Sequence, residues 1–408
     1  MSTETTRPAL QLSFSDKLRL WWDALARPAQ WAVGVPFILL IALLPVIKPP
    51  LLTTVGTDFG SVLAQFGMFA LLAIGLNVVV GQTGLLDLGY VGFYAIGAYT
   101  VALLTSPVSP WNLTDDWLSR DWAWLFAVPI AIAVTAASGL ILGTPTLRLR
   151  GDYLAIVTLG FGEIVRLLAD NLTNITRGGQ GLTQVAYPVV GVSEDKPNGV
   201  FSAGNTDQPF NAGTWWFWLS IVLIIVVLLV VGNLERSRVG RAWVAIREDE
   251  DAAEIMGVPT FKFKLWAFII GASIGGLSGA LYAGQVQFVV PSTFNVINSM
   301  LFLCAVVLGG QGNKLGVILG AFIIVYLPNF FLGRTEILGI PINGDDIADY
   351  KYLFFGVALV VLMIFRPQGL IPARQKLLAY GRPIYVATRK AALALSRKPA
   401  VDTEGGAS

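Results

Sequence analysis

The sequence predicts an all-α integral membrane protein with about ten transmembrane helices and both termini in the cytoplasm. Hydrophobic residues make up 55% of the chain and charged residues only 13%, whereas a soluble domain carries about 25% charged residues. The apolar residues gather in stretches that approach the roughly 20 residues needed to cross a hydrocarbon core about 30 Å thick. The basic residues are also distributed unequally between the two sides of the resulting topology.

The hydropathy pattern locates each span. The expected spans are residues 31–47, 61–80, 85–104, 122–143, 152–170, 214–232, 265–285, 298–310, 315–332 and 350–365. The first span is followed by Lys48, Pro49 and Pro50 rather than by a small-residue cleavage pattern. We therefore expect it to remain in the protein as an anchor instead of being removed as a signal peptide.

Lys and Arg fix the orientation of these spans. With the N-terminus in the cytoplasm, 21 of the 28 basic residues fall inside, six fall outside and Arg166 lies within a span. This asymmetry follows the positive-inside rule. The chain then divides into a cytoplasmic tail (1–30), a membrane domain (31–366) with an inside loop (233–264) and an outside loop (171–213), and a basic cytoplasmic tail (367–408).

The composition also excludes several function classes. The basic tails are explained by topology and by contact with anionic membrane lipid, so nucleic acid is not an expected partner. The chain has no histidine and one cysteine, Cys304, which excludes an intrachain disulfide and gives no indication of a metal site. The glycine-rich run from Gly309 to Leu315 lacks the Gly-Lys-Ser/Thr core of a phosphate-binding loop and is interpreted as a tight turn. We therefore predict no catalytic residue and no cofactor in this chain.

Ionisable residues within the expected spans are few. Asp87 follows a glycine-rich break, while Glu163 and Arg166 stand three residues apart on one expected helix. Side chains at that spacing face each other and can neutralise each other. We interpret these two as a structural pair rather than as a proton relay.

The inside loop contains a charged segment from Gly240 to Met256 that is expected to form one short helix, ended by Gly257 and Pro259. Alanines and other apolar residues form one part of its surface, and a dense set of charges forms the rest. Such a segment is either a solvated connector on the lipid headgroups or a docking element for a soluble motor. Four acids from Glu248 to Asp251 are poorly placed beside an anionic leaflet, which favours docking.

Several stretches together resemble one family. They are Gly75 to Tyr99, Leu147 to Ile164, Gly178 to Leu182, Arg247 to Gly257, Gly309 to Gly312 and Phe365 to Leu370. In this order they resemble the LivM-type permeases of bacterial branched-chain amino-acid ABC importers, over roughly residues 60–372. Residues 251–257 also resemble the coupling loop of ABC importers, although Asp251 replaces a glutamate there and the later part of that consensus is missing.

The resemblance implies a permease subunit in the bacterial cytoplasmic membrane that imports leucine, isoleucine and valine. The expected partners are a second related permease that completes the pore, two cytoplasmic ATPase subunits that bind the ATP, and an extracytoplasmic solute-binding protein. Related systems carry urea, amides or other amino acids, so these solutes stay open. The residues expected to couple to the ATPases are Arg241, Arg247, Glu248, Asp251, Ala252, Ala253, Glu254 and Gly257.

A zwitterionic solute with an apolar side chain needs partners for one carboxylate and one ammonium in a weakly binding passage. Breaks in membrane helices supply them, because they expose backbone N–H and carbonyl groups at depth. The candidate path residues are Asn77, Gly81, Gln82, Thr83, Gly84, Asp87, Gly89 and Gly92. Helix packing is the competing explanation for such glycines, and we prefer it for Gly271, Gly275 and Gly279 and for Gly312, Gly316 and Gly320. Residues 177–182 either line the outer mouth or form a plain turn.

Two other functions remain to be distinguished. An ion-coupled secondary carrier would accumulate solute by itself under an ion gradient, and a receptor or assembly scaffold would leave solute uptake normal when it is deleted.

Overall fold

The computed structural model describes residues 27–49, 52–114, 119–149, 151–192, 198–207, 209–337, 340–341, 344–365 and 369–371. The predicted cytoplasmic tails therefore lie almost entirely outside the described residues, as does part of the predicted outside loop. The side of the membrane on which the termini lie stays a prediction.

Each predicted span overlaps one helix. These helices are α2 (Arg27–Ile47), α3 (Phe59–Leu76), α4 (Val91–Thr105), α5 (Arg120–Thr146), α6 (Asp152–Asn171), α8 (Ala212–Arg236), α11 (Thr260–Val286), α12 (Val296–Gly309), α13 (Lys314–Phe331) and α15 (Lys351–Phe365). Among the described residues, five helices are long and apolar enough to cross a membrane: α3 with its continuation to Gln82, α5, α8, α11 and α13. The predicted class, a helical integral membrane protein, is confirmed.

Shorter elements connect these helices. They are the π-helix η1 (Asn77–Gln82), α7 (Thr173–Thr176), the 3₁₀ helices η2 (Gly178–Gln180) and η3 (Pro291–Phe294), α9 (Arg238–Glu248), α10 (Glu250–Ile255), α14 (Gly344–Asp349) and the strands β1 (Leu182–Thr183), β2 (Phe288–Val289), β3 (Glu336–Ile337) and β4 (Ile340–Pro341). Strand β1 pairs antiparallel with β2, and β3 with β4. Residues 177–182 thus end in a strand that ties this loop to the end of α11.

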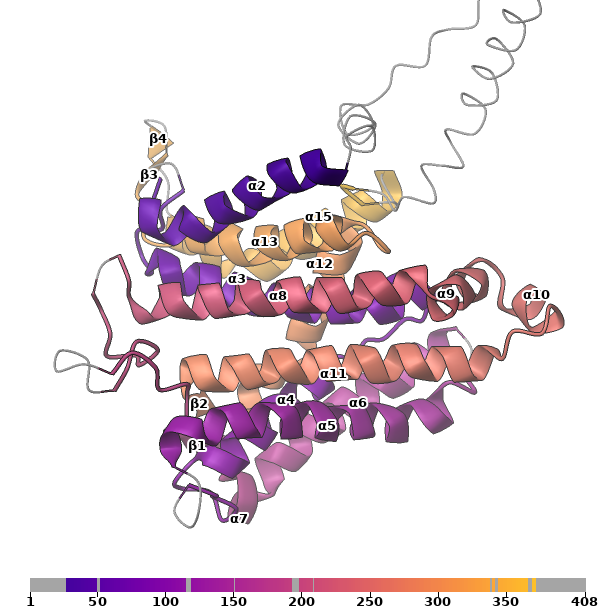
Figure 1. The fold of residues 1–408 in the computed structure, drawn as a ribbon, viewed down its shortest axis with the longest axis horizontal. Coiled ribbons are helices and arrows are strands. Elements are labelled where there is room, and N and C mark those ends of the chain that lie inside the picture. The colour runs from indigo at the N-terminus through magenta and orange to yellow at the C-terminus, as the bar shows by residue number, and fades with distance from the viewer. Residues whose placement is uncertain are drawn as a thin grey trace, which may run out of the picture.

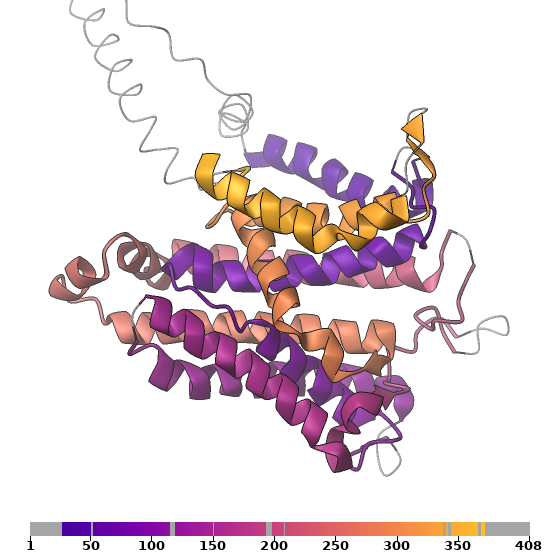
Figure 2. The same ribbon diagram turned by 180° about the vertical axis from the view of Figure 1, so that it is seen from behind.

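Helices α3 and α11 lie at the centre of the bundle. Helix α11 packs against α4, α5 and α3, and α3 packs in turn against α8 and α13. Figures 1 and 2 show the remaining helices on both sides of this pair. Helices α9 and α10 lie together at one end of the bundle, here named the α10 end, and β1 and β2 lie at the opposite end, the β1 end (Figure 1).

Small residues bring α4 and α11 into direct backbone contact. A Cβ atom added at Gly279 would lie 2.2 Å from the carbonyl oxygen of Tyr94 and 2.7 Å from the backbone nitrogen of Ala98. Added Cβ atoms at Gly271 and Gly275 would also meet residues of η1 and α4 closely, so packing is confirmed for this triplet. It is also confirmed for Gly316 and Gly320, which face α12.

The second triplet nevertheless contains one wrong assignment. Gly312 has a φ of 81° and lies in the turn between α12 and α13, not within a helix. Its backbone N–H donates to Asn77 instead of lying in a helix contact. The interpretation of Gly309 to Leu315 as a tight turn is confirmed, because α12 ends at Gly309, α13 begins at Lys314, and the Asn313 N–H donates to the Gly310 carbonyl at 3.1 Å.

Replacing Gly279 with leucine is expected to prevent stable folding. The atoms that the new side chain meets belong to the backbone of α4, so they cannot move aside as a flexible side chain would, and overpacking of this kind costs about 1–3 kcal/mol or more. The yield of monodisperse protein in detergent and its thermal unfolding temperature measure the effect. Gly356→Leu on α15 is the matched control, because an added Cβ there meets nothing within 4 Å. Equal yields of the two variants would contradict this account of the α4–α11 contact.

Candidate functional site

Helical geometry is interrupted between α3 and α4. Helix α3 continues as the π-helix η1, the chain then leaves helical geometry, and α4 begins only at Val91. A helix break at Gly81 and Gly84 was predicted. The third span was expected to begin at residue 85, so its predicted start is wrong by six residues. Gly84 explains part of the difference, because its φ of 74° ends the helix.

Residues 84–90 carry non-helical backbone into the interior. Figure 2 shows this stretch as a thin indigo coil that runs from the α10 end to the start of α4. Asp87 and Tyr90 are fully buried there. In a membrane protein such backbone is tolerated where protein covers it or where it lines a cavity. Single π-turns within helices are also common at functional sites.

The first four candidate path residues are held by other parts of the chain. The Asn77 side-chain oxygen accepts a hydrogen bond from the Gly312 N–H (2.8 Å), and the Gln82 amide nitrogen donates to Glu235 (2.7 Å). The Thr83 hydroxyl donates to the Val79 carbonyl within its own helix. An added Cβ at Gly81 would lie 2.6 Å from the Gly312 nitrogen. The structure therefore brings these residues together, with most of their polar groups already paired.

The later candidate residues lie against α6. The Leu88 N–H donates to the Thr158 hydroxyl (3.1 Å), and an added Cβ at Gly89 would collide with the Thr158 carbonyl oxygen. Gly92 faces Phe161 on the same helix. Asp87 accepts from the Gly89 N–H through one carboxylate oxygen, while the other oxygen is buried without a hydrogen-bond partner among the described residues. This oxygen is an unused polar group within the broken segment.

The predicted single helix over 240–256 is two helices. Helix α9 ends at Glu248, Asp249 is extended with a φ of −160°, and its carboxylate accepts a hydrogen bond from the Ala252 N–H that begins α10. Aspartate is a preferred N-cap, and acids in the first turn favour a helix N-terminus. The run Asp249, Glu250 and Asp251 was therefore a signal for a new helix start. Gly257 ends the segment as predicted, with a φ of 83°.

One side of α9 and α10 is anchored to the bundle. Trp243 is fully buried and donates from its ring nitrogen to the Phe263 carbonyl on α11 (2.8 Å), and Glu250 pairs with Lys264 on the same helix (2.5 Å). Ala253 is also buried. The prediction that Ala253 offers a docking surface is wrong, because neighbouring residues on a helix face different directions. Ala253 supports the loop from inside, and Ala252 is exposed.

The other side of α10 is an exposed apolar surface. Ile255 is 86% exposed and Met256 is 83% exposed. The exposed residues Arg241, Glu248, Asp251, Ala252 and Glu254 accompany them on this loop. Two large apolar side chains in this position are suited to insertion into a groove of another protein. The name docking surface is used below for Ile255, Met256 and Ala252.

The two predicted regions touch directly. Arg247 of α9 donates from its guanidinium to the Gly81 carbonyl in η1. Burial lowers the pKa of the Arg247 guanidinium, and the neighbouring Glu248 opposes this shift. One edge of the helix break is therefore hydrogen-bonded to the helix that precedes the docking surface.

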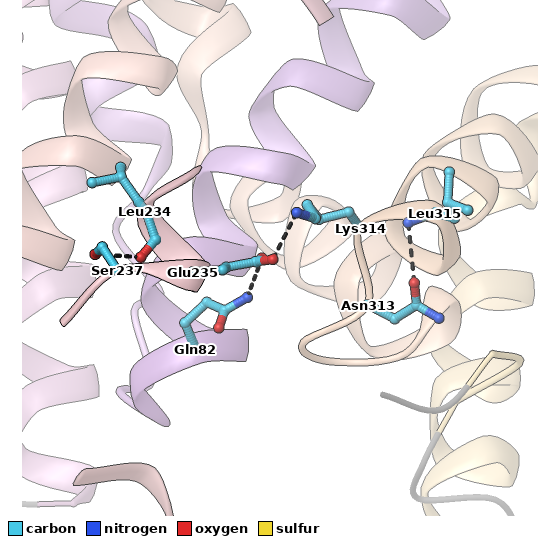
Figure 3. A network of polar contacts seen from close by, with 7 residues as sticks. All are labelled: Gln82, Leu234, Glu235, Ser237, Asn313, Lys314 and Leu315. Carbon is cyan, nitrogen blue, oxygen red and sulfur yellow. Dashed lines mark hydrogen bonds and ion pairs between the residues drawn. The ribbon is translucent and has the colours of Figure 1, made fainter. Parts of the chain in front are cut away.

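A second connection lies beside the first (Figure 3). Glu235, near the end of α8, accepts from Gln82 through one carboxylate oxygen (2.7 Å) and pairs with Lys314 of α13 through the other (2.6 Å). Gln82, Glu235 and Lys314 are named the junction cluster. They join η1, α8 and α13 just before the chain enters α9.

The sequence analysis missed Glu235 and Lys314, although a signal for them exists. An acid in the last turn of a helix and a base in the first turn both oppose the helix dipole. Glu235 and Lys314 each occupy such an unfavourable end. Because each residue is unfavourable at its own helix end, the ion pair between them is the interaction that explains their placement.

The predicted pair on α6 also forms, since both the Nε and the Nη2 atoms of Arg166 donate to one carboxylate oxygen of Glu163. A cavity of about 270 Å³ opens elsewhere, at the β1 end, and is lined by residues that include Asp58, Asn211, Trp216 and Gln285. It includes none of the candidate path residues.

Comparison with known proteins agrees with this architecture. The profile of the family described as branched-chain amino acid transport system / permease component matches residues 59–363. The chain is 41% identical to the high-affinity branched-chain amino acid transport system permease protein LivM of Salmonella typhimurium over 313 residues, which are 75% of this chain and 68% of that protein. The same figures hold for LivM of Escherichia coli.

A second type of permease is also similar. The chain is 26% identical to the high-affinity branched-chain amino acid transport system permease protein LivH of Salmonella typhimurium over 310 residues, which cover 74% of this chain and 91% of LivH. No solved structure matches the chain. The profile covers the whole helical region from α3 almost to the end of α15, and the chain therefore belongs to the branched-chain amino acid transport permease family.

Proposed function

We propose that this chain is a permease subunit of an ATP-driven importer in the bacterial cytoplasmic membrane, and that it moves branched-chain amino acids. The observation that carries the proposal is the direct contact between the helix break and the segment that bears the docking surface, through Arg247 and Gly81. A permease needs such a connection because the energy of ATP is released in another subunit. The names of the similar LivM and LivH proteins support the solute class.

In this mechanism two ATPase subunits bind the ATP, and one of them holds the docking surface. Closure of the ATPases displaces α9 and α10. Arg247 and the junction cluster transmit the displacement to η1 and to the ends of α8 and α13, because these contacts join the moving segment to the helix break. The chain itself needs neither a cofactor nor a catalytic residue for this step.

The sidedness follows from the same assignment. The α10 end faces the cytoplasm, where the ATPases are, and the β1 end faces outward, where a solute-binding protein delivers the amino acid. A second, related permease completes the pore. The non-helical backbone of residues 84–90 and the Asp87 carboxylate oxygen that has no hydrogen-bond partner among the described residues place polar groups in an otherwise apolar interior.

Copurification tests this assembly. When the chain is expressed with the second permease and the ATPase subunits, a tag on this chain is expected to retain the second permease and two ATPase subunits. Deletion of the chain is expected to abolish high-affinity uptake of leucine, isoleucine and valine. Unchanged uptake of all three in the deletion strain, together with lost uptake of urea or amides, would overturn the solute class.

A Gly84→Ala substitution is expected to lower ATP-driven uptake roughly tenfold while the complex still assembles. The φ of 74° costs a residue with a Cβ atom about 1–2 kcal/mol, but the added atom meets only Arg247, at 3.4 Å or more. Strain at the break is therefore introduced without a collision. Gly204→Ala in a loop is the control, since its nearest contact is 3.7 Å away. Wild-type uptake by the Gly84 variant would show that the break tolerates a different backbone geometry.

A further inference from the structure

We propose that the outward face of α6 is the surface on which this chain binds the second permease subunit. The α6 face consists of Tyr153, Ile156, Val157, Gly160, Ile164 and Leu167, with the Glu163–Arg166 pair beside them. This proposal rests on the proposed function, because it assigns a surface to one partner of that assembly.

The charged pair lies in the central part of α6. Glu163 lies roughly 12 Å from the C-terminal end of α6, given a rise of about 1.5 Å per residue, and is therefore well inside the span expected over residues 152–170. The side chains of Arg166 and Glu163 are nevertheless 25% and 33% exposed on the surface of the chain. Charged groups within a membrane face protein or water rather than lipid. The α6 face is therefore not a lipid-covered surface.

The other outward faces of the bundle differ from the α6 face. Helix α5 exposes Ile130, Val134 and Ile141 along its length. Helices α8 and α15 likewise expose only apolar large side chains in their central turns, such as Val226 and Val360. Among the ten described helices that match predicted spans, α6 is thus distinguished by charge at the centre of an exposed face. Lipid accounts for the other faces without any partner.

The α6 face also has a distinctive shape at Gly160. An added Cβ at Gly160 meets nothing within 4 Å, and Gly160 lies between the exposed Val157 and Ile164 at helical spacing. A glycine in this position leaves a notch in the surface into which a neighbouring membrane helix can pack closely. The notch is open here because no element of the part of the chain that the structure describes fills it.

The opposite face of α6 holds the helix break. Thr158 accepts from the Leu88 N–H, and Gly89 lies against the Thr158 carbonyl. A second permease seated on the α6 face is therefore separated from residues 84–90 by a single helix. The permease protein LivH, which is 26% identical to this chain over 310 residues, is an example of the kind of related permease that would supply that helix.

Gly160→Trp tests the proposal, with Val226→Trp on the exposed face of α8 as the matched control. Each variant is expressed alone and together with the second permease and the ATPases. Both chains are expected to keep the wild-type unfolding temperature when expressed alone. Gly160→Trp is expected to reduce the copurified second permease at least tenfold, and Val226→Trp to leave it unchanged. Full retention by Gly160→Trp would overturn the proposal.

A spin label supplies a second measurement that does not depend on disruption. In a Cys304→Ala background, Ile164→Cys and Val226→Cys are labelled in the assembled complex in lipid vesicles. The label at residue 164 is expected to be shielded from lipid-dissolved oxygen, and the label at residue 226 to be accessible. Equal accessibility at both positions would contradict the interface. If the unmodified chain copurifies no second permease, the proposed function fails instead, so the two failures are distinguishable.

Discussion

Replacing both Ile255 and Met256 with aspartate is expected to lower ATP-driven uptake by about a hundredfold or more. Their exposed fractions of 86% and 83% mean that the fold of this chain loses no internal packing. Truncation of one apolar anchor at the centre of an interface costs about 1–2 kcal/mol of binding free energy, so the loss of two costs about 3 kcal/mol. Each 1.4 kcal/mol corresponds to a factor of about ten in affinity. Uptake into vesicles and the amount of copurified ATPase report the loss.

Val190→Asp combined with Val192→Asp is the matched control for this experiment. Both residues are large, apolar and more than half exposed, but they lie in the loop at the β1 end. The control is expected to retain the ATPase subunits in full. The docking assignment is wrong if the Ile255–Met256 variant also retains them and hydrolyses ATP in response to solute.

Breaking the junction cluster is expected to separate ATP hydrolysis from transport. In Glu235→Gln the ion pair with Lys314 is lost, although both the ATPase docking surface and the membrane helices remain. A hydrogen bond between charged groups contributes about 1.5–3 kcal/mol, and the partial exposure of both side chains reduces this value. We therefore expect the number of solute molecules imported per ATP to fall roughly tenfold, with basal hydrolysis retained.

The reversed pair distinguishes a transmitting contact from a merely structural one. Glu235→Lys combined with Lys314→Glu restores an ion pair between α8 and α13, and each charge then also matches the dipole of its own helix. This double variant is expected to recover most of the lost number of solute molecules imported per ATP. Either single reversal places two like charges together and is not expected to recover it. Glu336→Gln, a change to an exposed acid of β3, controls for loss of charge. A single Glu235→Gln variant with a wild-type ratio would contradict the role of the cluster.

The sequence predicted those features that depend on local chemistry. Long apolar runs located the ten helices, with the start of α4 misplaced by six residues, and the glycines at Gly84 and Gly257 marked real ends because only a residue without a Cβ adopts their positive φ easily. The spacing of Glu163 and Arg166 predicted their ion pair because three residues nearly complete a helical turn. These inferences needed no knowledge of distant segments.

The features that were missed depend on contacts between distant segments. Glu235 reaches Gln82 across 153 positions and Lys314 across 79, and nothing in the local pattern of either region identifies the partner. The burial of Ala253 beside the exposed Ala252 likewise follows from how α10 lies on α11, not from the composition of the loop. Asp249 differs from these residues, because the acids that follow it in the sequence indicate its role as the N-cap of α10.

The exposure of the α6 face was also beyond the sequence. The pair Glu163 and Arg166 was predicted, but whether it lies inside the bundle or on its surface depends on which side of α6 the other helices occupy. That side is set by Thr158 and Gly162, which approach the break at Gly89. Only the three-dimensional arrangement of the helices shows that this charged pair lies on an outward face.

Uptake by purified components tests the central claim most directly. Vesicles are prepared that contain this chain, the second permease and both ATPase subunits. ATP and the ATPases are on the side of the membrane that the α10 end faces. Labelled leucine and the solute-binding protein are added on the opposite side. We expect leucine to move toward the ATP side only when ATP is hydrolysed, and vesicles with this chain alone to accumulate none under a proton or sodium gradient. Accumulation by this chain alone under an ion gradient would contradict the account.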